Sequence, residues 1–363
     1  MLKLKAQESK SDRPLLLLTI GLLIFGILMV FDASFVTATQ TFADKFHFVR
    51  LQAFWATLGL FLLILASKIN YHFWRKIAFP LFWSALFFLI LVLIPGVGLK
   101  FLGGRRWLGI GEFTFQPSEL AKIFFVIYLS SLMEKKKSLW RFLVLTGLVG
   151  LLVIMEPDLG TTVILIFSAF VVYFVSGASI GEIFLLSLLG VSGIAGLILV
   201  SPYRLFRLKA FLNPQFDPQG ASYHLRQILL ALGSGGWWGR GIGQSRQKFL
   251  FLPEAASDSI FAVIGEELGF VGGMAVLAAF WFLFVRGLKI ALQAPDRFGE
   301  ILAAGLTSTI FIQAFLNLAS MVSLVPLTGV PLPLISYGGS SLLVTLTSIG
   351  ILLNISKFKM RVK

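Results

Sequence analysis

Long apolar runs recur along the whole chain and constrain its fold more than any other feature. Runs of about 20 residues are long enough to cross a hydrocarbon core of about 30 Å as helices. The chain is 57% hydrophobic and only 13% charged, too few charges to cover so much apolar surface in water. The runs do not alternate, which excludes a transmembrane β-barrel. We therefore predict an all-α polytopic membrane protein with ten helices, over 14–36, 48–66, 78–95, 118–133, 140–155, 160–176, 181–200, 259–285, 299–325 and 334–354.

The Lys and Arg residues predict which side of the membrane each loop faces. With ten helices both termini lie on one side, and the segments expected on that side are rich in basic residues, whereas the short loops on the other side contain few. By the positive-inside rule, the termini and the basic loops are cytoplasmic. The same distribution accounts for most of the formal net charge of +14, so we expect no nucleic-acid partner.

Two loops expected on the outer side are unusual within what we predict to be a single membrane domain, residues 1–363. The segment 96–117 is rich in Gly and aromatic residues. We expect it to lie in the membrane interface or to re-enter the membrane, with Trp107 and Phe113 at headgroup depth. The segment 201–258 is the large extracytoplasmic loop between the seventh and eighth helices, long enough to fold over a site. Its glycine-rich part, ALGSGGWWGRGIGQSRQK, lets the backbone approach a ligand closely, and its N–H groups suit a phosphate.

Carboxylates are concentrated where this loop meets the eighth helix, in the stretch QKFLFLPEAASDSIFAVIGEELG (247–269). The stretch contains Glu254, Asp258, Glu266 and Glu267, in a chain with 17 acidic residues among 363. Asp258 stands at the outer membrane face after a basic loop, and we predict that it is the group presented to a ligand. The alternative is that it only caps the helix. Glu266 and Glu267 lie deeper on the helix and are expected in buried ion pairs, one of them with a neighbouring helix.

Charged residues also occur at the start of the fourth predicted helix. Glu119 and Lys122 are three residues apart and share one helix face, and Ser118 belongs to a good helix start. Two interpretations stay open: a structural ion pair, or a Lys122 that faces a cavity and binds an anion or tunes a carboxylate. In the turn before the sixth helix, Asp158 is either a functional carboxylate or the N-cap of that helix.

Four motifs, in order along the whole chain, resemble the SEDS family of FtsW and RodA peptidoglycan glycosyltransferases. The resemblance implies ten helices, a large extracytoplasmic loop between helices seven and eight, and lipid II as substrate. In this resemblance the family's essential Asp corresponds to Asp258. The motif sequences are more similar to the division branch, FtsW, than to the elongation branch, RodA. The motifs are GGRRWLGIGEFTFQPSELAK, EPDLGTT, the stretch from FLNPQFDPQGASYH to GEELGFVGG, and PLTGVPLPLISYGGSS.

The chain departs from the family pattern around Asp258. The His and Thr that usually precede this Asp are Ala256 and Ser257, and the Phe that usually follows it is Ser259. Glu156 stands where Gln is usual. A role for the missing His is therefore not carried over to this chain, whereas the role of the carboxylate is.

The resemblance implies attack of a lipid II sugar hydroxyl on the anomeric carbon of a lipid-linked glycan, with undecaprenyl pyrophosphate as the leaving group. A pyrophosphate leaves as a stabilised anion, so one general base suffices, and we assign that role to Asp258. The pyrophosphate also requires positive charge. The candidate substrate-binding residues are Lys122, Arg105, Arg246 and Lys248, with Glu119, Glu266 and Ser118 in supporting roles.

The expected cofactors and partners follow from the same resemblance. No set of residues has the spacing of a metal site, so a divalent cation (Mg²⁺ or Mn²⁺) is expected only with the substrate pyrophosphate. The implied partners are lipid II, the nascent glycan, a class B penicillin-binding protein transpeptidase and other divisome or elongasome membrane proteins. The implied location is the bacterial cytoplasmic (inner) membrane. Two alternatives stay open: an elongation-type RodA polymerase, and a lipid II flippase or transporter.

Overall fold

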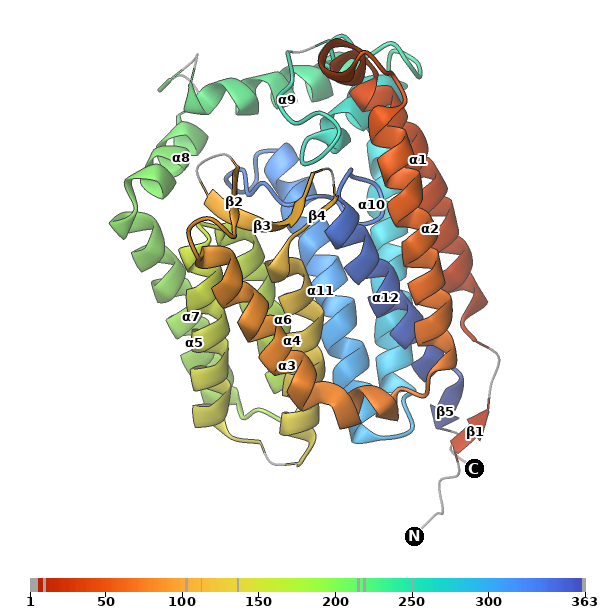
Figure 1. Ribbon diagram of the computed structural model, residues 1–363, viewed down its shortest axis with the longest axis vertical. Helices are drawn as coiled ribbons and strands as arrows, with labels where there is room; N and C mark the ends of the chain where they lie inside the picture. Colours follow the sequence, from red (N-terminus) through yellow and green to blue (C-terminus); the bar gives the residue numbers. More distant parts are fainter. Residues whose placement is uncertain are drawn as a thin grey trace.

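A computed structural model describes residues 6–8, 11–101, 104–111, 113–135, 137–213, 216–217, 220–249 and 251–360. Its long helices form a bundle with shorter elements at one end (Figure 1). The helices before the large loop are α1 (Arg13–Phe42), α2 (His47–Lys68), α3 (His72–Leu93), α4 (Pro117–Lys135), α5 (Leu139–Met155), α6 (Leu159–Val175) and α7 (Ile180–Val200). The loop contains α8 (Pro202–Leu212) and α9 (Ala221–Gly235), and the bundle is completed by α10 (Ile260–Leu292), α11 (Arg297–Met321) and α12 (Gly339–Ile355).

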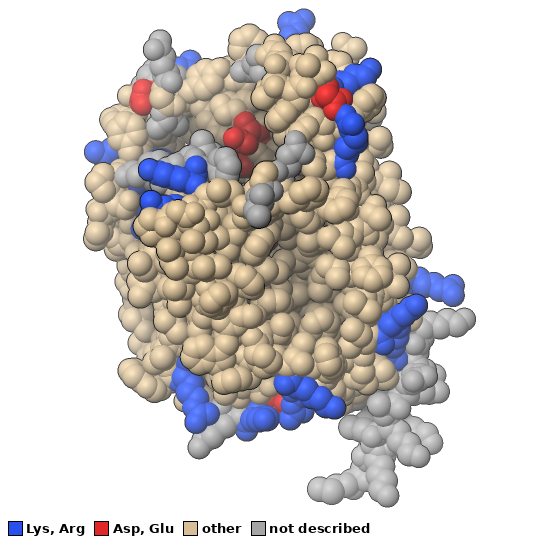
Figure 2. Space-filling view, viewed as in Figure 1, with Lys and Arg blue, Asp and Glu red and all other residues tan. Residues whose placement is uncertain are grey.

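The helices confirm the predicted polytopic fold. Among the residues that the structure describes, α1, α2, α3, α7, α10 and α11 are long and apolar enough to cross a membrane, and α5, α6 and α12 are shorter apolar helices. Together with α4 they correspond in order to the ten predicted spans, with the large loop after the seventh. Figure 2 shows that the visible face has a broad belt almost without charged residues between two charged ends. The chain is a multi-pass membrane protein.

The helix α11 lies at the centre of the bundle, and 89% of its apolar window is buried. It packs against α4, α6, α10 and α12. A Cβ at Gly305 would lie 2.7 Å from the side chains of both Val126 and Val172, so only glycine allows α4 and α6 to approach this closely. Such close backbone packing is typical of membrane helices, because lipid is as apolar as the side chains and gives them no hydrophobic reason to associate.

The helix α10 is broken in its N-terminal third, at Gly269. It has 33 residues, which is about 50 Å at about 1.5 Å per residue and longer than a hydrocarbon core of about 30 Å. At Gly269 the backbone leaves the helical region, with φ of 68° and ψ of −165°. Residues 270–292 are long enough to span the membrane by themselves, and the part before the break packs against α9 and the large loop.

The segment 96–117 folds into a small antiparallel sheet, which was not among the predicted elements. It contains β2 (Leu99–Phe101), β3 (Gly104–Ile110) and β4 (Phe113–Phe115), in the order β2-β3-β4. The segment expected to be interfacial or re-entrant is thus a sheet that pairs its own backbone groups at the end of the bundle (Figure 1). Its depth in the membrane stays a prediction. The strands are too short for their alternation to be recognised in the sequence.

The described residues nearest to the two ends of the chain lie together at the end of the bundle opposite this sheet (Figure 1). The strand β1 (Ala6–Glu8) pairs antiparallel with β5 (Phe358–Met360). Nearby, Asp12 forms an ion pair with Arg286 and accepts a hydrogen bond from the backbone amide of Leu15 at the start of α1. Both termini are therefore on the same side of the bundle.

Candidate functional site

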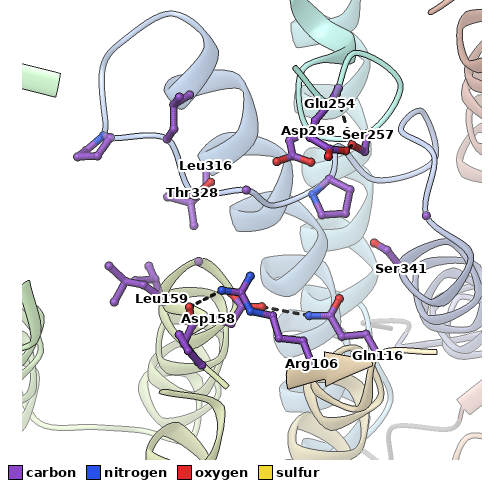
Figure 3. A pocket seen from close by; sticks show the side chains of 18 of the residues that line it. Arg106, Gln116, Asp158, Leu159, Glu254, Ser257, Asp258, Leu316, Thr328 and Ser341 are labelled. Carbon is purple, nitrogen blue, oxygen red and sulfur yellow. Dashed lines mark hydrogen bonds between the residues drawn. The ribbon is translucent and has the colours of Figure 1, made fainter. Parts of the chain in front are cut away.

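A cavity of about 570 Å³ opens at the end of the bundle away from the termini. Its walls come from β3 and β4, the start of α6, α7, α8, the turn before α10, the loop between α11 and α12, and the start of α12. Glu254, Ser257 and Asp258 lie on one side, and Arg106 and Asp158 lie on the other (Figure 3). On the α7 side the lining is apolar. The cavity therefore suits a ligand that has both a polar head and an apolar part.

Asp258 lies in the turn that leads into α10, and hydrogen bonds from α11 and from the following loop hold this turn in place. The Asn317 side chain donates to the Asp258 carbonyl at 2.7 Å. The Ser336 hydroxyl donates to the Ser257 carbonyl at 2.5 Å. The carboxylate is thus presented to the cavity from a backbone that two other parts of the chain fix.

The structure distinguishes the two candidate helix caps. The residue before α10 is Ser259, and no side chain caps that helix, so Asp258 does not act as its N-cap. Asp158, in contrast, caps α6 as predicted, because its carboxylate accepts from the Thr161 amide at 2.9 Å. The carboxylate of Asp158 also accepts from the Gln116 side chain at 3.1 Å in the cavity wall (Figure 3).

The surroundings of Asp258 favour its protonated form more than water does. Burial, and after it the Glu254 carboxylate, raise the pKa of Asp258 to about 6, although the Ser257 hydrogen bond and Arg207 act in the opposite direction. A carboxylate with a pKa of about 6 is mostly ionised at pH 7 and accepts a proton more readily than an ordinary Asp. Glu254 itself has a left-handed backbone, with φ of 51°, and accepts from the Ser257 hydroxyl at 2.7 Å.

On the opposite wall, Glu156 lies in the turn between α5 and α6, and Arg106 of β3 binds this turn. Glu156 is completely buried. Its burial, and after it the nearby Asp158, raise its pKa to about 9, so its carboxyl group is neutral at pH 7. The guanidinium of Arg106 donates to the Glu156 carbonyl at 2.8 Å and to the Pro157 carbonyl at 2.7 Å. These bonds fix Arg106 at the cavity.

The cations in the cavity wall are not the predicted ones. Among the described residues they are Arg106, Arg204 and Arg207, which we call the cavity arginines. The predicted Arg105 is next to Arg106 on β3, but it is not among the residues that line the cavity. Arg204 and Arg207 are three residues apart on α8 and share one face of that helix. This spacing is the sequence pattern from which Arg204 and Arg207 could have been recognised as candidate site residues.

Lys122, Glu119 and Ser118 are buried behind the cavity wall and do not line the cavity. The predicted ion pair is present, with 2.8 Å between Lys122 Nζ and Glu119 Oε1. Lys122 also donates to the Gln313 side-chain carbonyl at 2.5 Å, and the Gln313 amide donates to the Ser341 hydroxyl at 2.9 Å. Because Ser341 lines the cavity, the ion pair supports the cavity wall through Gln313. Direct contact between Lys122 and a ligand stays a prediction.

Lys248 and Arg246 lie outside the cavity lining, in the glycine-rich part of the large loop. The Nζ atom of Lys248 lies 2.7 Å from Asp32 Oδ1 of α1 and 2.8 Å from Glu267 Oε1 of α10. The backbone amide of Arg246 donates to Glu266 at 3.0 Å. Glu266 and Glu267 are buried and lie in ion pairs, as predicted, with Arg240 at 3.7 Å and with Lys248 at 2.8 Å. Their partners belong to the large loop, however. For one of the two glutamates we had expected a partner on a neighbouring helix.

The amides of the glycine-rich loop bind carboxylates of the chain itself. The amides of Gly243 and Ser245 each donate to Glu267 at 3.0 Å. The amide of Gln247 donates to Glu266 at 3.2 Å. The predicted phosphate cradle is corrected accordingly: two internal anions take that position and fasten the loop to α10.

Comparison with known proteins places these features in one family. The family model of the FtsW, RodA and SpoVE cell cycle proteins matches residues 13–361. The chain belongs to the FtsW/RodA/SpoVE family. This membership confirms the resemblance that the sequence motifs indicated.

Several members of the FtsW/RodA/SpoVE family match the chain over almost its whole length. Stage V sporulation protein E of Bacillus subtilis (strain 168) is 41% identical over 360 residues, which cover 97% of this chain and 98% of the relative. The probable peptidoglycan glycosyltransferase FtsW of Trichlorobacter lovleyi is 40% identical over 354 residues, which cover 95% of this chain and 93% of the relative.

Solved structures of the FtsW/RodA/SpoVE fold agree with the arrangement described above. One, described as "Structural coordination of polymerization and crosslinking by a peptidoglycan synthase complex", matches with a TM-score of 0.78 and 28% identity, over 95% of this chain and 97% of that one. The crystal structure of the Thermus thermophilus rod shape determining protein RodA matches with a TM-score of 0.70 and 28% identity, over 95% of this chain and 96% of that one.

The departures from the FtsW/RodA/SpoVE pattern lie in the turn that carries Asp258. Ala256 is partly buried against the core, and Ser257 binds the Glu254 carboxylate. Ser259 is completely buried, and its hydroxyl lies 2.7 Å from Nε2 of His224 on α9. A histidine from the large loop is thus close to this turn. Sequence reasoning missed it, because a lone His on a loop helix gives no spacing signal.

Proposed function

We propose that the chain is a peptidoglycan glycosyltransferase of the division machinery that polymerises lipid II at the outer face of the bacterial cytoplasmic membrane. Family membership and the names of the FtsW relatives support this activity and this role. The observation that carries the proposal is the position of Asp258. It is a carboxylate on a fixed turn, in a cavity with arginines on its walls and an apolar side toward α7.

In the proposed reaction, a sugar hydroxyl of the acceptor lipid II attacks the anomeric carbon of the lipid-linked donor glycan. The hydroxyl proton passes to the Asp258 carboxylate while the new glycosidic C–O bond forms. The bond between the anomeric carbon and the pyrophosphate oxygen breaks, and undecaprenyl pyrophosphate leaves as an anion. A glycosidase needs a second carboxyl group to protonate its leaving alkoxide, whereas this leaving group needs no proton.

The cavity arginines are the groups we propose for binding the pyrophosphate. Guanidinium groups bind phosphate oxygens with charge-assisted, often bidentate, hydrogen bonds. Arg106 is fixed on one wall by two backbone carbonyls, and Arg207 lies close enough to Asp258 to lower its pKa. In this proposal the cavity arginines take the direct role expected of the side chains of Arg105, Lys122, Arg246 and Lys248.

A divalent cation, Mg²⁺ or Mn²⁺, is proposed to enter with the substrate and not to be held by protein ligands alone. Over the described part of the chain, no group of three or more His, Cys, Asp or Glu side chains has the arrangement of a metal site. Asp258 and Glu254 share one wall, and Asp158 lies on the other. The phosphate oxygens of the substrate would therefore have to supply several of the ligands, and we derive no step through the metal.

The undecaprenyl chains require an apolar surface that is open to the bilayer, and we propose that the α7 side of the cavity provides it. Ile194 and Ile198 of α7 line the cavity together with Val163 of α6 and Leu316 of α11, and we call these residues the α7 groove. Among the described residues of α7, Leu186 is the only buried one. An isoprenoid chain is thus able to reach the cavity along a helix that is packed loosely against the bundle.

The orientation and the partner are part of the same proposal. The paired strands β1 and β5 lie opposite the cavity, and basic residues such as Arg75 and Lys137 lie at that end of the bundle. Of these two, Arg75 is in the first turn of α3 and Lys137 is in the loop between α4 and α5. By the positive-inside rule that end is cytoplasmic. A class B penicillin-binding protein is the proposed partner, because a similar solved structure is described as a peptidoglycan synthase complex that coordinates polymerization and crosslinking.

Polymerisation of labelled lipid II by the purified protein, alone and with its transpeptidase partner, tests the proposal. We expect Asp258→Asn to lower the rate by about 10²–10⁴-fold, the usual contribution of a general base. The control is Asp44→Asn, which makes the same change in the outer loop between α1 and α2, outside the cavity lining. Full activity of Asp258→Asn would disprove the assignment of the base. Lipid II transport without polymerisation by the wild type would favour a flippase.

A further inference from the structure

A second, smaller cavity of about 270 Å³ adjoins the first, and Asp258 lines both. Side chains of α8 and α9, including Arg207 and His224, line the smaller cavity, and Asp258 and Arg207 also belong to the first cavity. The turn that carries Asp258 therefore borders open space at two cavities. The backbone of such a turn needs support from more than one side to keep its carboxylate in place.

His224 supplies a contact of this kind from α9. Its Nε2 atom lies 2.7 Å from the Ser259 hydroxyl, which is completely buried. The backbone of Pro253 is a second hydrogen-bond partner of the same ring. Because proline has no N–H, this partner is the carbonyl and the imidazole donates to it. The ring thus contacts the residue before Glu254 and the residue after Asp258.

The charge state of the ring fits these two partners. Burial, and after it the nearby Arg207, lower the pKa of His224 to about 4, so the imidazole is neutral at pH 7. A neutral imidazole has one donor and one acceptor nitrogen. In the tautomer that places Nδ1–H toward the Pro253 carbonyl, the Ser259 hydroxyl donates to Nε2. Both hydrogen-bonding atoms of the ring are therefore used within the turn 253–259, and neither is left to act as an acid or base.

We propose that His224 is a positioning residue for Asp258, which ties the turn 253–259 to α9 and so holds the carboxylate at the place of reaction. The inference rests on the proposed glycosyltransferase function. Since α9 lies in the large loop outside the bundle, this contact also couples the position of α9 to the geometry of the reacting carboxylate. A displacement of about 1 Å at a reacting group is enough to lower a rate about a hundredfold.

Initial rates of lipid II polymerisation, measured over a range of lipid II concentrations, test the inference with four variants. His224→Phe keeps a ring of similar shape but removes both hydrogen bonds, and His224→Gln keeps one donor and one acceptor. Ser259→Ala removes one partner, and the double variant combines it with His224→Phe. The matched control is Arg226→Ala, an exposed residue two positions further along α9. The thermal unfolding of every variant is measured in the same detergent.

We expect His224→Phe to lower kcat at least about tenfold with little change in KM, because the substrate still binds but the base is misplaced. His224→Gln should recover most of the rate. Ser259→Ala should lower kcat less, and the double variant should be no slower than His224→Phe, since both changes remove the same interaction. Arg226→Ala should behave as the wild type.

Several outcomes would overturn the inference. The first is an unchanged kcat in His224→Phe. The second is a double variant whose loss of kcat equals the sum of the two single losses. The third is a loss of kcat that parallels a lower unfolding temperature and that His224→Gln does not restore. If His224→Phe does not fold, Ser259→Ala and His224→Gln still test the inference. A kcat of Ser259→Ala equal to that of the wild type would contradict a role for the contact between His224 and Ser259. Suppose that the wild type is active, Asp258→Asn is inactive and His224→Phe is unaffected. That result disproves the positioning role of His224 and leaves the proposed function standing. A wild type that does not polymerise lipid II, alone or with its partner, overturns the proposed function as well.

Discussion

Two carboxyl groups near the cavity differ in charge at pH 7 because their surroundings differ. Asp258 lines the cavity, has Arg207 nearby, and its pKa of about 6 leaves it mostly ionised. Glu156 is completely buried next to Asp158, and its pKa of about 9 leaves it protonated. A neutral Glu has the same shape as Gln, which explains how a Glu is tolerated at this position of the turn. Only Asp258 of this pair is able to accept a proton.

The neutral state of Glu156 predicts that Glu156→Gln stabilises the protein. The folded pKa of about 9 is above the ordinary value of 4.5, so folding takes up a proton between these values. The contribution of the protonated carboxyl to stability is fully present below about pH 4.5 and is lost as the pH rises toward 9. Glutamine avoids this loss, so the gain in unfolding temperature should be larger at pH 8 than at pH 6. Thermal unfolding in detergent at the two pH values measures it, and a lower unfolding temperature for the variant at pH 8 would contradict it.

At the scale of elements, buried charges attach the large loop to the bundle. Lys248 bridges Asp32 and Glu267, and the loop amides bind Glu266 and Glu267. Removing one member of a buried ion pair leaves the other uncompensated, which typically costs about 3–5 kcal/mol. We therefore expect Lys248→Met to lower the unfolding temperature and to expose the loop to proteases. The second substitution Asp32→Asn should restore part of the loss, since it removes one of the two unpaired carboxylates.

Limited proteolysis with mass spectrometry locates the cuts in Lys248→Met. Cleavage in the segment 239–249 is expected, because this part of the loop depends on the buried cluster. Arg240→Met is a useful comparison, since Arg240 is 3.7 Å from Glu266 and its side chain is 32% exposed. Arg240→Met should lower the stability of the protein less than Lys248→Met, because partly exposed ion pairs contribute little to stability. Equal effects of the two changes would mean that the cluster is not what attaches the loop.

The break in α10 depends on a single glycine. Gly269 has a φ of 68°, and a Cβ there would lie 2.3 Å from the backbone nitrogen of Gly239. Gly269→Ala therefore combines a left-handed backbone, which costs other residues about 1–2 kcal/mol, with a clash against the loop backbone. We expect a clearly lower unfolding temperature. Gly273→Ala, one turn further on, meets Phe261 only at 3.4 Å and should be neutral or slightly stabilising. Similar unfolding temperatures for the two variants would refute this explanation of the break.

How far the sequence predicts such a structure depends on the kind of contact involved. The spans were predictable because crossing a bilayer requires apolar length, and Asp258 was predictable because it is a carboxylate at a loop-to-helix junction. The choice of Arg106 over Arg105 was not, because Arg106 is held at the cavity by carbonyls of a turn about 50 residues further along the chain. Nor was the role of Lys248, since its partner Asp32 is 216 residues away along the chain. Contacts between distant segments decide these assignments, and no local pattern encodes them.

At the scale of the whole molecule, the position of α7 connects the polar site to the membrane. Figure 1 shows α7 at the outer edge of the bundle, followed directly by α8, which bears two of the cavity arginines. One continuous segment therefore contributes both to the apolar α7 groove and to the cationic wall. A lipid-linked pyrophosphate has the same order of parts, an isoprenoid chain followed by an anionic head. The spatial order of the apolar groove and the cationic wall thus matches the order of the isoprenoid chain and the pyrophosphate in this class of substrate.

This fit predicts that filling the α7 groove weakens substrate binding. Ile194→Trp places a larger side chain in the groove, where overpacking costs about 1–3 kcal/mol. The KM for lipid II should then rise at least about fivefold, because about 1.4 kcal/mol corresponds to a factor of ten. The value of kcat should change little, because Asp258 and the cavity arginines are untouched. Val191→Trp is the matched control, since Val191 is on the same helix but is 69% exposed and does not line the cavity. An unchanged KM in Ile194→Trp, or an equal rise in both variants, would show that the lipid chain reaches Asp258 by another path.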